Sequence, residues 1–160
     1  MDATEGMKLA DERFIVSDVR ELLDLTELKE IITYRLIAER VLNDIEESAE
    51  PQYDLDARVR KDDGGIETRF RMHVEAPNAR YIADVGGIFV NKNPLDISAS
   101  IMRDFINEIG IMVVFPYLRE AITGLAARLG MAPPLLGFLR RGEGTFGPDP
   151  SATTGTEHDA

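Results

Sequence analysis

The sequence predicts an α+β domain in which a four-stranded antiparallel sheet is followed by a long kinked helix and a short C-terminal helix. Three observations lead to this fold class. Apolar and polar residues alternate strictly in residues 53–60 and 66–75, which is typical of half-buried strands. Short turn signals separate these segments, so consecutive strands pair in antiparallel fashion. After Asn93 the apolar spacing changes from two to 3.6, which places the helices after the sheet.

The N-terminal part precedes this pattern. Residues 1–12 are polar, and we expect them to be flexible. Asp18 stands three residues before Glu21, a spacing typical of a capping box at a helix start. We expect a short helix here, with an extended segment as the alternative; four apolar residues would share its face, namely Val19, Leu22, Leu23 and Leu28.

Four segments are predicted strands. Residues 31–42 are rich in β-branched and aromatic side chains, and residues 43–52 form an acidic loop that contains Pro51. The sequence KDDGG at residues 61–65 predicts a hairpin turn in which glycine supplies a positive backbone φ. A second turn, APN, precedes the fourth strand at residues 79–91.

Two glycines, Gly86 and Gly87, interrupt the fourth strand. Glycine inside a strand marks either a β-bulge or a close approach of another part of the molecule. Three apolar residues follow the pair, so we expect this strand end to face apolar surroundings on both sides.

The C-terminal half is predicted to be helical. Pro94 suits a first helical turn, and Pro116 is expected to kink or restart the helix because proline cannot donate to the helical ladder. Gly130 fits a helix end, and prolines hold residues 131–141 extended. We therefore expect one domain over residues 13–141 and a disordered tail over residues 142–160.

Composition excludes several classes of function. The chain has no cysteine, so it can form neither a disulfide nor a thiolate metal site. Its formal net charge of −11 disfavours binding to nucleic acid. There is no apolar run of about 18 residues and no signal-peptide pattern. We expect a cytoplasmic protein that does not insert into membranes and needs no cofactor.

Reactive groups are scarce. His73 falls on the polar side of a strand and His158 in the tail, and neither has a partner at metal-ligand spacing. Carboxylates such as Asp54 and Glu67 alternate with arginines, which is more typical of a solvated cross-strand network than of acid–base catalysis. The sequence predicts no catalytic residue and no metal ligand.

Several motifs resemble the SecB family of export chaperones. They are GGIFV at residues 86–90, FPYLRE at 115–120, APPLL at 132–136 and YDLDARV at 53–59, in the order and spacing of that family. The resemblance covers roughly residues 53–139. It implies a homotetramer, a dimer of dimers, with the long helices sandwiched between antiparallel sheets. It also implies an ATP-independent holdase that binds unfolded preproteins in apolar grooves and delivers them to the SecA motor.

We assign two sets of candidate residues on this basis. The client-binding candidates are the apolar face of the second strand and the segment after the long helix: Tyr53, Leu55, Ala57, Val59, Leu135, Leu136, Phe138 and Leu139. The alternative is that these side chains fill the core of the protomer. The candidates for the oligomer interface are Phe105, Ile109, Met112 and Arg119.

The N-terminal region departs from the SecB family, because thirty residues that include the predicted helix precede the first strand. Some family members instead protect an antitoxin in toxin–antitoxin systems, so an antitoxin is the alternative partner to SecA. Candidates for a SecA contact are Asp54, Asp56 and Glu67. A different class of function, a small-molecule-binding or enzymatic α+β domain, is the competing hypothesis.

Overall fold

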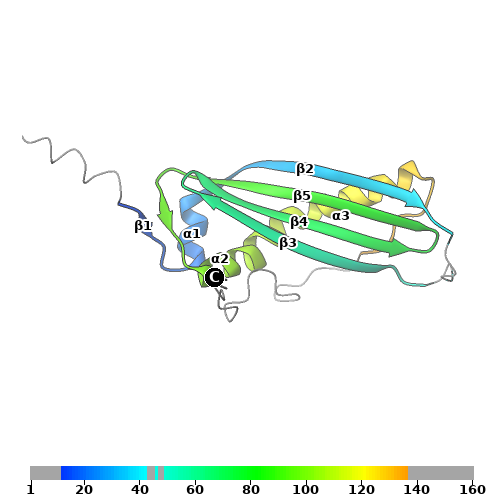
Figure 1. The fold of residues 1–160 in the computed structure, drawn as a ribbon, viewed down its shortest axis with the longest axis horizontal. Helices are drawn as coiled ribbons and strands as arrows, with labels where there is room; N and C mark the ends of the chain where they lie inside the picture. Colours follow the sequence, from blue (N-terminus) through cyan, green and yellow to red (C-terminus); the bar gives the residue numbers. More distant parts are fainter. Residues whose placement is uncertain (1–11, 43–45, 47–48, 137–160) are drawn as a thin grey trace, which may run out of the picture.

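A computed structural model describes residues 12–42, 46 and 49–136 of the chain. A four-stranded antiparallel sheet has the order β2-β5-β4-β3, and a helical run lies across one of its faces (Figure 1). The strands are β2 (Thr26–Arg40), β3 (Gln52–Asp62), β4 (Gly65–Ala76) and β5 (Ala79–Asn91). The predicted α+β class is confirmed.

The first helix, α1 (Val19–Leu25), has the predicted cap. The Glu21 N–H donates to Asp18 Oδ1 at 2.8 Å, and Glu21 Oε2 accepts from the Ser17 N–H at 2.7 Å. Hydrogen bonds from the Ser17 hydroxyl and backbone lower the pKa of Glu21. The placement of Leu28 on this helix was wrong. Thr26 already pairs with Asn91, so backbone pairing with β5 ends the helix and starts β2 there.

The two hairpin turns are confirmed, but the backbone of the first turn differs from the prediction. Within the described residues, Gly130 is the one glycine with positive φ, so neither glycine of KDDGG has it. Instead, Asp62 Oδ1 accepts from the N–H groups of Gly64 and Gly65, at 2.8 and 3.0 Å. Gly65 is required for space, because a Cβ there would lie 2.2 Å from the Phe89 carbonyl oxygen.

The paired glycines of β5 serve close approach and not a bulge. β5 pairs with β4 in unbroken register, and the two irregularities lie between β2 and β5, at Leu28/Glu30 and Thr33/Arg35. A Cβ at Gly86 would lie 3.1 Å from the Tyr34 ring, and one at Gly87 would lie 3.3 Å from Val114. The glycines therefore let a bulged tyrosine lie against one face of β5 and a helix against the other.

The helical run has three parts, α2 (Ala99–Phe105), the π-helix η1 (Ile106–Gly110) and α3 (Ile111–Arg128). Pro116 was predicted to kink or restart the helix, but it lies inside α3. The departure from α-helical geometry occurs at η1 instead. Pro94 was also misplaced: it precedes β6 (Leu95–Asp96), which pairs in parallel with β1 (Phe14–Ile15). The helix is capped by Ser98, whose side chain accepts from the Ile101 N–H.

The helical run ends as predicted, at Gly130 with φ of 66°. Residues 131–136 are neither helix nor strand. The predicted short C-terminal helix and the predicted tail fall on residues outside the described part of the chain. The same holds for the flexible segment expected at residues 1–12, except for Glu12.

From Ala99 to Arg128 the helical run is 30 residues long and apolar enough to cross a membrane by length and composition alone. Its apolar side packs on the sheet, however, which is how core helices of soluble proteins acquire the same hydropathy. The Phe89 and Phe105 rings meet edge to face there, with centroids 5.0 Å apart. The core therefore lies between this run and the sheet face that carries Phe70, Met72 and Tyr81.

The π-helix lies closest to the sheet at Gly110. A Cβ added to Gly110 would lie 2.9 Å from Thr68 Cγ2 and 3.0 Å from Thr68 Oγ1. Thr68 is fully buried, and its hydroxyl has no hydrogen-bond partner among the described residues. No larger residue fits at position 110 without displacing the helix from β4.

Gly110→Ala is expected to lower the free energy of unfolding by about 2 kcal/mol, because the added methyl group overpacks the contact with Thr68. Gly124→Ala is the matched control. It adds a methyl group to α3 where nothing lies within 4 Å, so it should stabilise by about 0.5–1 kcal/mol through helix propensity. Urea titrations at one fixed protein concentration measure both. Equal effects of the two substitutions would contradict this description of the helix–sheet contact.

Candidate functional site

The apolar face of the sheet is wider than the helix that covers it. Four strands about 4.8 Å apart make a sheet about 19 Å wide, whereas a helix with its side chains is about 10–12 Å across. α3 lies against β5, with smaller contacts to β2 and β4 (Figure 1). The edge strands β2 and β3 are therefore covered on this face only in part.

On β3 the exposure follows from this position. Tyr53, Leu55, Ala57 and Val59 stand opposite Val74, Met72, Phe70 and Thr68 of β4, so they share the apolar face. The four β4 residues are fully buried. Tyr53, by contrast, is 49% exposed, and the other three β3 side chains are half-buried against the core. The structure thus brings these four predicted client-binding residues together along one partly open strip.

The segment after α3 carries the other predicted client-binding residues. Leu135 is 91% exposed, and Leu136 is half-buried against the core. Phe138 and Leu139 lie outside the described residues. The start of this segment borders a cavity of about 330 Å³ at the end of the sheet where β4 turns into β5. Its lining is mostly apolar: Ala49, Pro51, Ala76, Pro77, Asn78, Tyr81, Met131, Ala132, Pro133 and Pro134.

The predicted interface residues fall in different environments. Phe105 is completely buried inside the single chain, so in this conformation it offers no surface to a second subunit. Ile109 is half-buried, whereas Met112, in the first turn of α3, is 48% exposed. The Arg119 guanidinium lies 5.1 Å from the centre of the Phe115 ring.

The opposite face of the sheet is charged, and many of its charged side chains are paired with one another. Arg60 pairs with Glu67 at 3.4 Å and Arg80 with Glu75 at 2.6 Å, which confirms the predicted cross-strand network for these carboxylates. Glu67 also accepts a hydrogen bond from the Tyr34 hydroxyl, which raises the pKa of Tyr34.

Asp84 is the buried centre of this face. Its side chain is 1% exposed, and it accepts hydrogen bonds from Arg69 and Arg71 at 2.6–3.0 Å. Burial alone would raise the pKa of Asp84, but the hydrogen bonds and positive charges of the two guanidinium groups outweigh it and lower the pKa. The carboxylate therefore ties β5 to β4 and is not free for chemistry.

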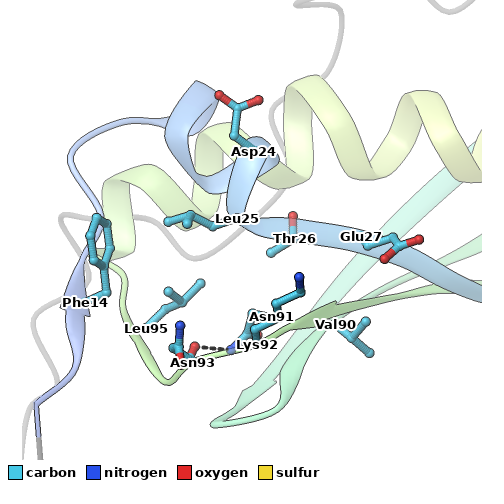
Figure 2. Close-up of a pocket in the computed structure, with 10 residues that line it drawn as sticks. All are labelled: Phe14, Asp24, Leu25, Thr26, Glu27, Val90, Asn91, Lys92, Asn93 and Leu95. Atoms are coloured by element: carbon cyan, nitrogen blue, oxygen red, sulfur yellow. Dashed lines mark hydrogen bonds between the residues drawn. The ribbon is translucent and has the colours of Figure 1, made fainter.

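A larger cavity, of about 660 Å³, lies at the other end of the sheet (Figure 2). Sequence reasoning missed it, because two of its lining residues, Phe14 and Leu95, belong to β1 and β6, two-residue strands far apart in the chain. The lining residues are Phe14, Asp24, Leu25, Thr26, Glu27, Val90, Asn91, Lys92, Asn93 and Leu95.

Groups suited to catalysis or metal binding do not gather at any of these places. Within the described residues, no three His, Asp or Glu side chains are placed to hold a metal ion. His73 is half-buried on the charged face, opposite Asp54 on β3. The described part of the chain thus presents a partly covered apolar face and no cluster of side chains suited to metal binding.

Comparisons with known proteins identify the family. No protein-family model matches the chain. The chain is 32% identical over 125 residues to the SecB-like chaperone SmegB of Mycolicibacterium smegmatis, a match that covers 78% of this chain and 83% of the relative. The chain therefore belongs to the SecB-like chaperones, which are not enzymes, and the enzymatic alternative is wrong.

A solved structure agrees with this assignment at the level of the fold. The SecB-like chaperone Rv1957 of Mycobacterium tuberculosis, in complex with a ChAD peptide from the Rv1956 HigA1 antitoxin, matches with a TM-score of 0.63 and 17% sequence identity. The match covers 76% of this chain and 94% of that chain.

Asp84→Asn is expected to lower the free energy of unfolding by about 2 kcal/mol at pH 7, because two guanidinium groups lose their buried carboxylate. The pKa of Asp84 is lowered from its ordinary value of 3.8. The stabilisation of the folded state by the Asp84 carboxylate is therefore complete above that pH. It is lost as the pH falls towards the lowered pKa of the folded state. The difference between wild type and variant should narrow as the pH falls below 3.8.

Urea titrations between about pH 3 and 7 measure this difference. Glu75→Gln is the matched control, because it removes an ion pair that is about half exposed and should cost less than about 0.5 kcal/mol. A difference between wild type and Asp84→Asn that does not depend on pH would contradict the assigned role of this carboxylate.

Proposed function

We propose that this chain is an ATP-independent holdase that binds unfolded polypeptide segments along β3 and the segment after α3. The observation that carries the proposal is the partly open apolar strip of Tyr53, Leu55, Ala57 and Val59. Such a strip accepts many sequences, because apolar burial is not directional. No ATP-binding motif is needed for this activity.

The strength of binding follows from the area. At about 25 cal/mol per Å², burial of a few hundred Å² of apolar surface gives on the order of 10 kcal/mol before the cost of ordering the client. That cost reduces the net affinity to a level that permits release. The net charge of −11 favours clients with basic residues and keeps the exposed apolar surface soluble.

The family resemblance suggests two kinds of partner, an antitoxin client and the SecA motor. The antitoxin peptide bound to the Rv1957 chaperone supports a client of that kind. For delivery to SecA, Asp54 and Asp56 are exposed on β3, whereas Glu67 is engaged by Tyr34 and Arg60 and is less available. We propose that the chain is cytoplasmic. Affinity purification of the chain from cells that express it would show whether SecA or an antitoxin is bound.

We further propose that the chain forms a homotetramer, a dimer of dimers. Met112 and Tyr117 are 48% and 44% exposed on α3, and Leu28 and Leu36 are about as exposed on edge strand β2. Two separate apolar surfaces on one protomer are what two different subunit contacts require. Light scattering that gives a mass other than four chains would contradict this assembly.

Leu135→Asp together with Tyr53→Asp is expected to weaken the suppression of aggregation at least fivefold, because both side chains lie on the proposed binding surface. The measurement is light scattering of a chemically unfolded protein diluted into buffer without ATP. Leu23→Asp is the matched control: Leu23 is 43% exposed on α1, at the opposite end of the sheet, and this variant should retain activity (Figure 1). A wild-type protein that does not suppress aggregation would overturn the proposal.

A further inference from the structure

The charged face of the sheet is not uniform, because its centre carries an excess of positive charge. Four arginines from β2, β3 and β4 lie there, and we call them the arginine patch: Arg35, Arg58, Arg69 and Arg71. Two carboxylates lie among them. Asp56 of β3 stands opposite Arg71, and Asp84 of β5 stands in the register position between Arg71 and Arg35. Four guanidinium groups therefore face two carboxylates in a chain whose net charge is −11.

Two members of the arginine patch are held in a fixed orientation. Nε and Nη2 of both Arg69 and Arg71 donate to Asp84 at 2.6–3.0 Å. The Arg69 guanidinium also lies 3.9 Å from the centre of the Tyr34 ring. Among the described residues, Nη1 of neither arginine forms a hydrogen bond, and the two side chains are 31% and 29% exposed. Each guanidinium thus keeps donor hydrogens for a further acceptor.

The other two members have no partner in the part of the chain that the structure describes. Arg35 and Arg58 are exposed, and neither makes an ion pair or a side-chain hydrogen bond there. Arg58 also stands directly opposite Arg69, and like charges in that position destabilise a sheet. Arg60, two residues further along β3, pairs instead with Glu67 at 3.4 Å. A carboxylate from outside the chain would convert the repulsion between Arg58 and Arg69 into attraction to both.

A small depression of about 20 Å³ lies within the arginine patch, and its lining is entirely charged: Asp56, Arg58, Arg69, Arg71 and Asp84. A space of this size holds one group as large as a water molecule. Asp84 already accepts four hydrogen bonds, which is the full capacity of a carboxylate. The N–H groups of three guanidiniums then outnumber the one remaining carboxylate, so the depression favours an anionic oxygen over a cation.

We propose that the arginine patch binds an extended acidic segment of another protein, with carboxylates at alternate positions. Alternate residues of an extended chain are about 7 Å apart, which is also the spacing of Arg69 and Arg71 along β4. A segment that lies along the strands therefore brings one carboxylate to each of these two arginines. This inference goes beyond the proposed holdase function, because it concerns the face of the sheet opposite the apolar strip on β3.

The charges around the arginine patch favour a short acidic segment over a nucleic acid. Exposed carboxylates border the patch on both edge strands, among them Glu30 of β2 and Asp54 of β3. A duplex, with one phosphate charge about every 1.7 Å of its axis, would extend over these carboxylates and be repelled. A segment with two or three carboxylates stays on the patch. At physiological ionic strength it is screened from charges more than about 8 Å away, so the net charge of −11 does not prevent binding.

The test uses the full chain and three fluorescein-labelled peptides. The first is Gly-Ser-Glu-Ser-Glu-Ser-Glu-Ser-Gly, in which glutamates alternate with serines. The second has the same composition with its glutamates consecutive, and the third has lysine in place of each glutamate. Fluorescence anisotropy at an ionic strength of about 0.05 M measures the dissociation constants. The wild type is expected to bind the alternating peptide about threefold more tightly than the consecutive one and about tenfold more tightly than the lysine peptide.

Variants locate the binding on the arginine patch. Arg35→Gln/Arg58→Gln should weaken binding of the alternating peptide about tenfold, because it removes the two unpaired guanidinium groups. Arg20→Gln/Arg128→Gln is the matched control: it removes two exposed arginines without ion pairs from α1 and α3, and it should keep the affinity. Arg58→Gln alone should raise the unfolding midpoint by about 1–2 °C without peptide, because the repulsion from Arg69 is relieved, and yet weaken binding. A merely structural arginine would not give these opposite effects.

Four results would overturn the inference. The wild type suppresses aggregation but does not bind the alternating peptide, in which case the holdase function stands without an acidic partner. Arg35→Gln/Arg58→Gln binds the peptide as tightly as the wild type does. A fluorescein-labelled oligonucleotide binds the wild type more tightly than the peptide and loses its affinity in Arg35→Gln/Arg58→Gln, which would make nucleic acid the partner. The same variant changes the oligomer mass measured by light scattering, which would make this face a contact between copies of the chain.

Discussion

One helix covers a sheet that is too wide for it, and most of the structure follows from this mismatch. α3 lies over β5 because Gly87 offers no side chain there and Val114 can approach the strand backbone. Once the helix is centred on an inner strand, the two edge strands lie outside its width. Tyr53 on one edge and Leu36 on the other remain about half exposed, although both belong to the apolar face.

The charged face of the sheet limits how much apolar surface the protein exposes. A sheet with two apolar faces and a single helix would expose too much apolar surface to stay soluble. Here the second face is closed by ion pairs around Asp84, whose carboxylate is satisfied by Arg69 and Arg71 from the neighbouring strand. The exposed apolar side chains of the two edge strands, Tyr53 and Leu36, therefore lie on the face that carries the helix and not on the charged face.

The sequence was sufficient for those parts of the fold that depend on local pattern. Alternation located β3, β4 and β5, and the spacing of Asp18 and Glu21 located α1. Leu28 was misplaced because Glu27, Lys29 and Glu30 make the start of β2 look helical, and only pairing with β5 decides its state. The π-helix was missed because Gly110 owes its position to Thr68, a residue on another strand.

The candidate site was predictable to the same extent. The strip on β3 follows from alternation, so Tyr53 and its neighbours could be named, but the degree to which α3 covers them could not. The large cavity could not be predicted at all, since Phe14 and Leu95 meet through two-residue strands that no local pattern indicates.

We propose that the β3 flank of the helix is open in the free protein and is covered when a client binds. The chain has no cysteine, so single cysteines report this directly. Tyr53→Cys is expected to react with a maleimide at a rate close to that of an unfolded chain, and an unfolded client should slow it at least tenfold. Val85→Cys, at a fully buried position on β5, should stay unreactive in both states. A cysteine at position 53 that is protected without client, or that reacts equally fast with it, would contradict the account.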